Sequence, residues 1–249
     1  MKIHRDVTRK RLLPRGSVVT IGVFDGMHRG HARLVRAVVR QSRRLGVPSV
    51  VVTFCPHPVH VLRPKIYCPL IVSLDYRLKI LESLGVDHCA VIPFKKSFAR
   101  LSPRSFIEKY LVRPFSPKLI MVGDDFRFGH SRRGTGEMFR QIGRRRGFDF
   151  MAVSTREHGW KRFSSTRIRD FIIRGKLSMA ARLLGRPVSI YGRVIHGDAR
   201  GHRLGYPTAN INPVNELLPP SGVYVVLVRY GERVFPGVAS IGRRPSFKK

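Results

Sequence analysis

The chain has 249 residues, of which 48 are lysine or arginine and 15 are aspartate or glutamate, so its formal net charge is +33. A hydrophobic fraction of 43% is enough to build real cores and excludes an intrinsically disordered protein. The three cysteines form no C-x-x-C pair, which argues against a disulfide framework or a thiolate zinc site. We therefore expect one large or two ordinary domains in the cytoplasm.

The positive charge attracts polyanions in general, including ATP, flavin phosphates, RNA and acidic membranes. The basic residues are nevertheless scattered, apart from short runs at 43–44, 132–133 and 144–146. The sequence contains no apolar run long enough to span a bilayer and no aromatic-plus-basic module for reading nucleic acid. We expect no membrane partner and no nucleic acid as the main partner, whereas a homo-oligomer stays open.

Short β-branched runs alternate with amphipathic segments, which predicts an α/β domain with a parallel sheet. Ser73 and Ser102 are expected helix N-caps, and Gly85 is an expected helix stop. We expect strands at 18–21, 49–54, 88–93, 118–122 and 148–153, and helices at about 28–46, 73–84, 102–111, 163–175 and 178–184.

The corner between the first strand and the first helix is a candidate phosphate site. The first N–H groups of a helix are unpaired and favour anions, and Gly22, Gly26 and Gly30 leave room for a ligand. His28 and His31 would lie on one helical face and could neutralise charge on a phosphorus centre. The alternative is two exposed histidines beside an ordinary glycine turn.

A second helix start carries the sequence FSSTRIRDF, residues 163–171. Serine and threonine at such a position are usually only caps. Here Ser164, Ser165 and Thr166 stand beside Arg169, whose guanidinium can fork onto phosphoryl oxygens. Two phosphate-binding helix starts suit a triphosphate. A zinc site made of these corner histidines with His57 and His60 is disfavoured, because no carboxylate or cysteine stands at matching spacing.

The character of the sequence changes at Gly185-Arg186-Pro187. Short strands are then expected at 189–195, 223–230 and 234–241, separated by glycine, proline and asparagine clusters, which is typical of a small β-barrel. We therefore divide the chain into a basic segment at 1–15, an α/β domain at 16–185 and a partial barrel at 186–249.

These motifs carry a family resemblance. Residues 22–31, GVFDGMHRGH, resemble the G-x-F-D-G-x-H-x-G-H signature of the nucleotidylyltransferase module in bacterial bifunctional riboflavin kinase/FAD synthetases. Residues 54–58, 123–129 and 163–169 are similar to the family's F-x-P-H-P, G-x-D-F-R-F-G and I-S-S-T-x-I-R motifs. Residues 197–210 resemble the riboflavin kinase signature G-x-x-x-G-x-x-L-G-x-P-T-A-N, and residues 237–247 match G-V-A-N-I-G-x-R-P-T-F.

The resemblance implies a Rossmann-like FMN adenylyltransferase domain, which makes FAD and pyrophosphate from FMN and ATP, followed by a domain of the type that phosphorylates riboflavin to FMN with ATP and Mg²⁺. It implies His28 and His31 as catalytic residues. The residues implied to bind the nucleotide are Gly22, Phe24, Asp25, Gly26, Asp125, Ser164, Ser165, Thr166 and Arg169.

In the second domain the glycine-dense loop, with Gly197, Gly201, Gly205 and Pro207, would fold over phosphates. Thr208 and Asn210 offer oxygens to Mg²⁺. In the family, further strands and a helix with a proposed catalytic glutamate follow the last motif, whereas here two lysines follow. We therefore expect an incomplete barrel and impaired kinase activity. The alternatives are another H-x-G-H adenylyltransferase and a basic RNA-binding protein on a degenerate enzyme fold.

Overall fold

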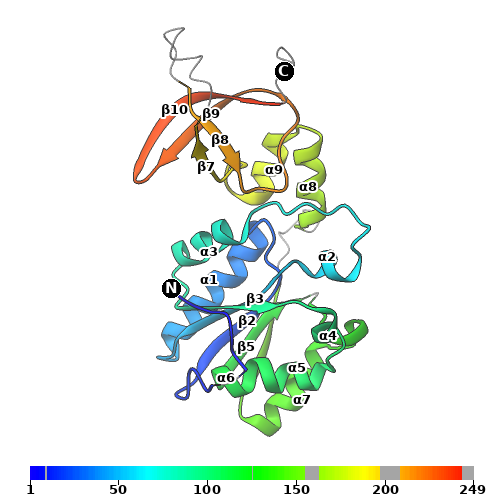
Figure 1. The fold of residues 1–249 in the computed structure, drawn as a ribbon. Coiled ribbons are helices and arrows are strands. Elements are labelled where there is room, and N and C mark those ends of the chain that lie inside the picture. The colour runs from blue at the N-terminus through cyan, green and yellow to red at the C-terminus, as the bar shows by residue number, and fades with distance from the viewer. Residues whose placement is uncertain (9, 125, 155–162, 197–207, 243–249) are drawn as a thin grey trace.

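A parallel sheet forms the N-terminal part of the computed structural model, which describes residues 1–8, 10–124, 126–154, 163–196 and 208–242 (Figure 1). The strand order is β1-β4-β3-β2-β5-β6, and every neighbouring pair is parallel. The expected α/β class and its five strands are confirmed, and β1 is an additional edge strand. The strands are β1 (Lys2–His4), β2 (Ser17–Ile21), β3 (Ser49–Cys55), β4 (His88–Pro93), β5 (Pro117–Gly123) and β6 (Asp149–Val153).

Helices cover both faces of this sheet (Figure 1). On one face, α1 (Arg29–Arg44) and α3 (Leu74–Ser83) share a core with Val18 and the strand residues that point the same way. On the other face, Val19 and its equivalents pack against α5 (Pro103–Ile107), α6 (Arg113–Phe115) and α7 (Gly136–Arg146). The central strands are apolar on both sides because successive side chains point to opposite faces and both faces are buried.

Local signals set the helix ends as expected. The Ser73 and Ser102 side chains accept hydrogen bonds from the third residue after each cap, and Gly85 has a φ of 81°. The helix that begins at Pro103 runs through a π-helical turn, η1 (Glu108–Val112), into α6; Pro114 has no N–H to continue the regular ladder there. The smaller elements are α2 (Pro58–Leu62), α4 (Lys96–Ala99) and the 3₁₀ turn η2 (His130–Arg132). Helix α7 is an element that the sequence patterns above do not predict.

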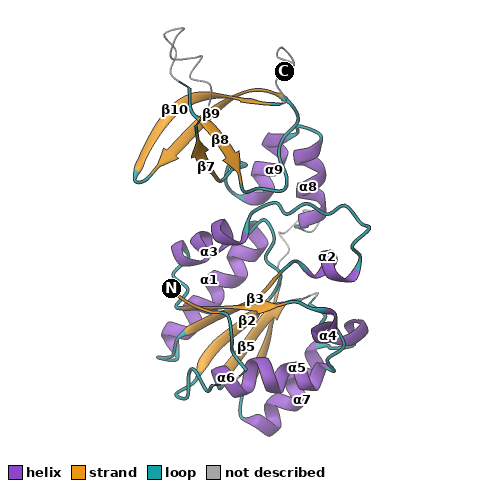
Figure 2. Cartoon of the chain, viewed as in Figure 1, coloured by secondary structure: helices purple, strands orange, loops and turns teal. Residues whose placement is uncertain are grey.

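The C-terminal part begins with a helical hairpin, α8 (Ser165–Ile173) and α9 (Leu177–Leu184), and continues into antiparallel strands (Figure 2). In the described residues β7 (Gly192–Ile195) pairs with β8 (Asn210–Pro213), and β9 (Gly222–Tyr230) pairs with β10 (Arg233–Ile241). The first of these strands starts three residues later than expected, because the Tyr191 N–H bonds the Asn215 side chain. No helix among the described residues is long and apolar enough to cross a membrane.

Candidate active site at the carboxyl ends of the central strands

The loops after β2 and β5 leave the same edge of the sheet, because these strands are parallel neighbours. The chain continues from β2 to β3 on one side, whereas β5 and β6 lie on the other side. Ligands of open α/β sheets bind in the crevice where the strand order reverses in this way. The expected phosphate corner therefore lies at the switch point. Asp125, the expected nucleotide contact after β5, lies outside the described residues.

The loop between β2 and α1 has an unusual backbone. The φ angle is 54° at Phe24, 79° at Gly26 and 43° at Met27. A residue other than glycine in the left-handed region costs about 1 to 3 kcal/mol, and it persists only where the surroundings hold it. This loop is therefore shaped by contacts from other elements.

Two of the residues expected to bind the nucleotide shape this loop from inside. The Phe24 side chain is only 2% exposed, and a Cβ on Gly22 would lie 2.9 Å from its ring. Gly22 thus makes room for the Phe24 ring, where the sequence suggested room for a ligand. The ring packs edge-on against His31, with the ring centroids 5.3 Å apart, so Phe24 supports the corner from the core.

His28 and His31 meet at the start of α1. His28 is the N-cap of the helix, one residue before its first turn, and its Nδ1 accepts a hydrogen bond of 3.2 Å from the His31 N–H. The two rings stack with centroids 3.6 Å apart and planes 14° apart. Phe163, just before α8, stacks on the outer side of His28 at 5.9 Å. The expected pairing of the two imidazoles at a helix start is confirmed, although one serves as the cap.

Burial keeps both imidazoles neutral at pH 7. Desolvation lowers the pKa of His28 to about 4, with the positive charge of Arg186 adding to the shift. Desolvation, His28 and Arg77 together lower the pKa of His31 well below its ordinary value. Because the His28 Nδ1 accepts a hydrogen bond, the proton of the neutral ring is assigned to Nε2. That Nε2–H is a donor available to a phosphate oxygen.

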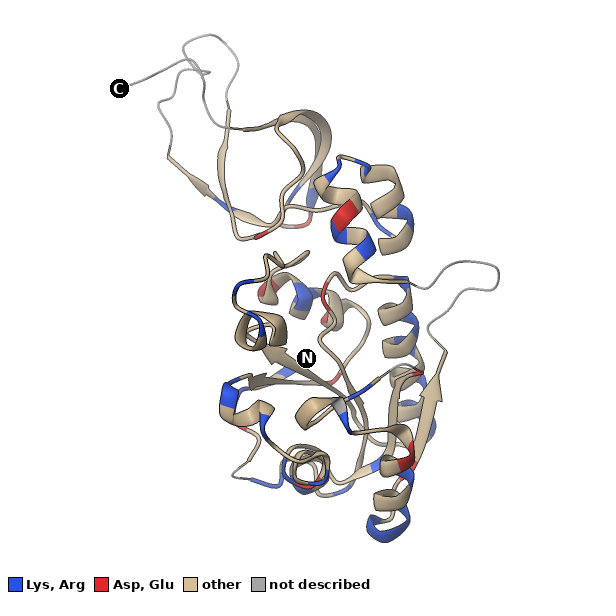
Figure 3. Ribbon diagram, turned by 90° about the vertical axis from the view of Figure 1, so that its right-hand side faces the viewer, with Lys and Arg blue, Asp and Glu red and all other residues tan. Residues whose placement is uncertain are grey.

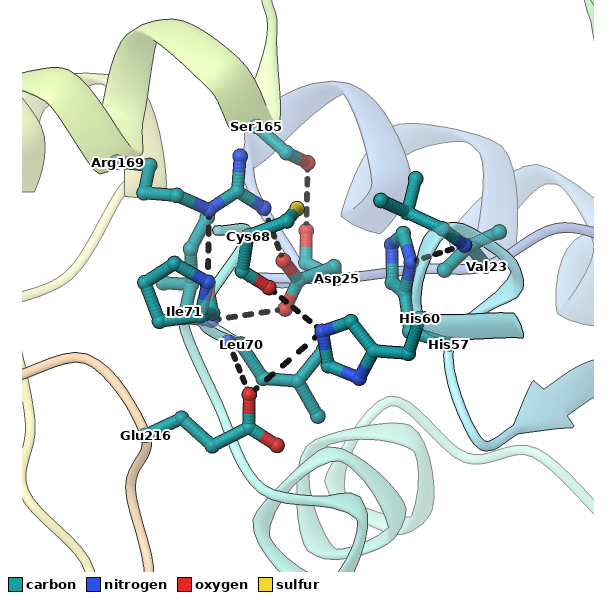
Figure 4. Close-up of polar contacts among 12 residues, drawn as sticks. Val23, Asp25, His57, His60, Cys68, Leu70, Ile71, Ser165, Arg169 and Glu216 are labelled. Atoms are coloured by element: carbon teal, nitrogen blue, oxygen red, sulfur yellow. Dashed lines mark hydrogen bonds and ion pairs between the residues drawn. The ribbon is translucent and has the colours of Figure 1, made fainter. Parts of the chain in front are cut away.

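Asp25 is the centre of a buried polar network (Figure 4). Its carboxylate is 2% exposed and accepts hydrogen bonds from the Ile71 N–H at 3.0 Å and from Nη2 of Arg169 at 2.8 Å. Its backbone carbonyl accepts a 2.8 Å hydrogen bond from the Ser165 hydroxyl. Burial raises the pKa of Asp25, and the nearby positive charges of Arg169 and Arg77 oppose that shift.

This network changes the interpretation of the α8 start. Arg169 also donates Nε to the Pro69 carbonyl at 2.8 Å, so both described contacts of its guanidinium go to protein groups, where the sequence suggested phosphoryl oxygens. Ser165 is likewise turned to the β2–α1 loop. Ser164 is the N-cap of α8, and its side chain makes no cap hydrogen bond, while Thr166 is exposed. These last two hydroxyls stay candidates for phosphate contacts.

Sequence reasoning missed two arginines, one buried and one half-buried, that hold the β2–α1 loop. Arg77 of α3 is 2% exposed and donates Nη1 to the Val23 carbonyl at 2.8 Å and to the Thr53 hydroxyl at 3.3 Å. Arg186, after α9, donates to two carbonyls of the same loop. Nothing in the sequence separates Arg77 from the other basic residues, whereas Arg186 stands at the change of sequence character noted above.

The expected kinase loop falls largely outside the described residues, because Gly197, Gly201, Gly205 and Pro207 all belong to 197–207. Of the two expected Mg²⁺ donors, Thr208 is exposed and Asn210 is the half-buried first residue of β8. Their ligand roles stay predictions.

His57 and His60 have roles of their own near α2. His57 is the N-cap of that helix, and His60 Nε2 donates to the Cys68 carbonyl at 2.7 Å. Beside His60 an open hollow of about 430 Å³ has walls that include Ile66, Tyr67 and Pro69. The Pro69 carbonyl holds Arg169, so the hollow adjoins the Asp25 network.

Lysine and arginine residues are spread over helices and loops of both parts, as expected from their scatter in the sequence (Figure 3). Helix α1 alone carries exposed arginines at 29, 33, 36, 40, 43 and 44 and no acidic residue. The surface is therefore strongly cationic around a corner whose imidazoles are neutral. Such a field draws anionic ligands towards the site.

Comparisons with known proteins match both parts. A family model described as FAD synthetase matches residues 10–167, and one described as riboflavin kinase matches residues 184–249. A bifunctional riboflavin kinase/FMN adenylyltransferase from Escherichia coli K12 is 38% identical over 99% of this chain and 79% of that relative. A bifunctional riboflavin kinase/FMN adenylyltransferase from Pseudomonas fluorescens is 37% identical over 99% of this chain and 79% of that relative.

Among solved structures, a crystal structure described as a macrolide-efflux protein from Streptococcus pneumoniae matches with a TM-score of 0.84 and 33% identity. The match covers 99% of this chain and 81% of that chain. This likeness supports the same fold throughout both parts.

The depressed pKa of His28 predicts a loss of stability in acid. In the unfolded chain His28 becomes protonated as the pH falls below 6.5, whereas in the folded protein it stays neutral down to about pH 4. The free energy of unfolding therefore falls across that interval. For His28 the loss from pH 7.5 to pH 5 is about 2 kcal/mol. Urea unfolding of the wild type and of His28→Asn at both pH values measures this loss of stability. Asparagine is the chosen replacement because it keeps a capping oxygen.

His57, whose pKa burial also lowers to about 4, is present in both proteins and cancels in the comparison. The wild type should lose more stability than the variant as the pH falls. Equal losses in the two proteins would contradict the assignment of a buried neutral imidazole to His28.

Proposed function

The chain belongs to the bifunctional riboflavin kinase/FMN adenylyltransferase family, and we propose that its adenylyl-transfer centre is the corner formed by the β2–α1 loop and the start of α8. The observation that carries this proposal is the stacked His28–His31 pair at the N-terminus of α1, at the switch point of the sheet.

The enzyme makes FAD from FMN and ATP. A phosphate oxygen of FMN forms a bond to the α-phosphorus of ATP while the bond from that phosphorus to the bridging oxygen of pyrophosphate breaks. No covalent intermediate on the protein is needed. The protein's task is to position two anionic groups and to stabilise the charge on the oxygens around the α-phosphorus.

The two histidines are suited to this task. The neutral His28 donates Nε2–H to a phosphoryl oxygen, and the first N–H groups of α1 and the helix dipole favour the same anion. A nearby phosphate raises the pKa of an imidazole, because an opposite charge favours the protonated form. His28 and His31 thereby gain positive character when the substrates are bound, and the hydrogen bonds strengthen as charge develops.

At the start of α8, Ser164 and Thr166 contact the remaining phosphates of ATP. Ser165 and Arg169 do not contact ATP themselves. Ser165 binds the Asp25 backbone carbonyl, and Arg169 binds the Asp25 carboxylate. In this assignment Asp25 and Gly26 contribute the shape of the loop that presents its N–H groups to the nucleotide.

Mg²⁺ enters with ATP. Mg²⁺ usually keeps several waters and binds substrate phosphates with few protein ligands. This preference fits the described part of the chain, in which no cluster of three or more His, Cys, Asp or Glu side chains could hold a metal ion. In the kinase part, the Thr208 hydroxyl and the Asn210 amide oxygen would be its protein donors.

We assign residues 16–185 to adenylyl transfer and residues 186–249 to the riboflavin kinase part, with 1–15 as a preceding basic segment. The matched ranges, 10–167 and 184–249, support the boundary between the two parts. The segment 1–15 also contributes β1 to the sheet of the first part. We place the enzyme in the cytoplasm, where ATP is abundant and the three free cysteines, Cys55, Cys68 and Cys89, stay reduced.

The hollow beside α2 suits the flavin ring of FMN. Flavin rings are flat and aromatic, and the hollow offers the apolar Ile66 and the 80% exposed ring of Tyr67. Stacking on such a ring would hold the flavin while its phosphate reaches the histidine corner.

The histidine assignment is tested by His28→Asn and His31→Gln. We expect each variant to lose about 100- to 1,000-fold in kcat/KM for FAD formation, because an amide side chain cannot gain the positive character with which the imidazole stabilises the transition state. Chromatography of the flavins formed from FMN and Mg-ATP measures it, with riboflavin in a parallel reaction.

His88→Asn is the matched control, because His88 begins β4 at the opposite end of the sheet. The control should turn over normally. Wild-type rates in either corner variant would refute the catalytic assignment.

The flavin site is tested by Tyr67→Ala. The loss of a stacking surface should raise KM for FMN about 10-fold and leave KM for ATP unchanged, in line with a loss of about 1.4 kcal/mol. Initial rates with each substrate varied in turn measure both constants. Tyr230→Ala, which removes an equally exposed tyrosine from β9, is the control. An unchanged KM for FMN would place the flavin elsewhere.

A further inference from the structure

Arg186 joins the C-terminal part of the chain to the catalytic loop. It follows α9 and Gly185, and its guanidinium donates Nη1 to the Met27 carbonyl at 2.9 Å and Nη2 to the Gly26 carbonyl at 2.7 Å. These carbonyls belong to consecutive residues that both have left-handed φ angles. The next residue is His28, so Arg186 binds the backbone carbonyls directly before the helix N-cap.

The contact is part-buried and specific. Arg186 Nε lies in the protein without a hydrogen-bond partner among the described residues, and desolvation lowers the pKa of the guanidinium. Burial of a charged group is unfavourable unless the contacts it makes compensate for the lost water. The fork of the guanidinium matches two adjacent carbonyl acceptors, which the single nitrogen of a lysine cannot reproduce.

A second contact from the same part of the chain reaches the other side of this loop. Asn215, between β8 and β9, is 8% exposed and donates Nδ2 to the Ile71 carbonyl at 3.3 Å. The Ile71 N–H in turn holds the Asp25 carboxylate. Leu70 is bound on both sides too, since its N–H donates to Glu216 and its carbonyl accepts from the Leu217 N–H.

Both contacts come from residues matched by the riboflavin kinase model, whereas the FAD synthetase match ends at residue 167. We propose that Arg186, at the start of the kinase part, is a positioning residue for adenylyl transfer that holds the Gly26–Met27 peptides and thereby the His28 ring. This inference rests on the proposed role of His28. The two parts of the enzyme then share one catalytic loop, and the kinase side completes the adenylyl-transfer centre.

The charge of Arg186 also acts on His28. The titratable groups facing the His28 ring in the described residues are Arg186 and the stacked His31, and Arg77 acts on His31 from α3. Of these, Arg186 carries a fixed positive charge that opposes protonation of His28. Its replacement by a neutral residue removes that opposition, so the pKa of His28 rises.

The test uses Arg186→Gln and Arg186→Lys in the full chain, with Arg193→Gln of β7, an exposed arginine of the same part, as control. We expect kcat for FAD formation to fall about 10- to 100-fold in Arg186→Gln, because small displacements of a catalytic group have effects of this size. Arg186→Lys should recover part of the rate, KM for ATP and FMN should change less than kcat, and Arg193→Gln should behave as wild type.

The titration of the His28 ring separates positioning from a merely structural role. In NMR titrations the His28 imidazole should become protonated at higher pH in Arg186→Gln and near the wild-type pH in Arg186→Lys, which keeps the charge. A normal kcat and an unchanged His28 titration in Arg186→Gln would overturn the inference. A loss of activity that only follows a loss of thermal stability, with no shift of the His28 titration in either variant, would overturn it too.

Failure of the role of Arg186 and failure of the proposed role of His28 give different results. If the wild type makes FAD, His28→Asn does not, and Arg186→Gln matches the wild type, only the role of Arg186 is rejected. If His28→Asn itself is fully active, the assignment of the corner is rejected.

Discussion

The buried carboxylate of Asp25 is the constraint on which the β2–α1 corner depends. A charge that is almost fully shielded from water must be paired, and the loss of one partner of such a pair costs about 3 to 5 kcal/mol. Arg169 and the Ile71 N–H provide the pairing, and they lie 144 and 46 residues away in the sequence. The strained β2–α1 loop thus acquires its shape only when α8 and the segment around residue 71 are in place.

The electrostatics of the molecule divide between surface and centre. The surface is cationic, with a net charge of +33 and an unbroken basic face on α1. The two imidazoles at the centre are kept neutral by burial. This arrangement attracts anionic ligands over a long range, and in the proposed mechanism a bound phosphate induces the positive character of the histidines.

The two matched parts of the chain are less separate in space than in sequence. Arg186 and Asn215 reach back to the β2–α1 loop and to the segment that holds Asp25. A third apolar cluster contains Ile71 from the first part, Ile168 and Ile172 from α8, and Leu217 from beyond β8. The α8–α9 hairpin therefore packs against both parts of the chain. The geometry of the proposed adenylyl-transfer centre depends on residues that follow this centre in the sequence.

The sequence by itself determined most strands and helices and the place of the corner, because these follow from signals within a few residues: β-branched runs, caps such as Ser73, and glycine stops such as Gly85. The short strands β1 and β8 carry no such signal. It also determined the family, because the motifs are contiguous. Only the tertiary structure decided that Phe24 points into the core, that Arg169 holds Asp25, and that Arg77 and Arg186 hold the loop. Those pairings join residues far apart in the chain, and no local pattern distinguishes a buried arginine from the other members of a very basic composition.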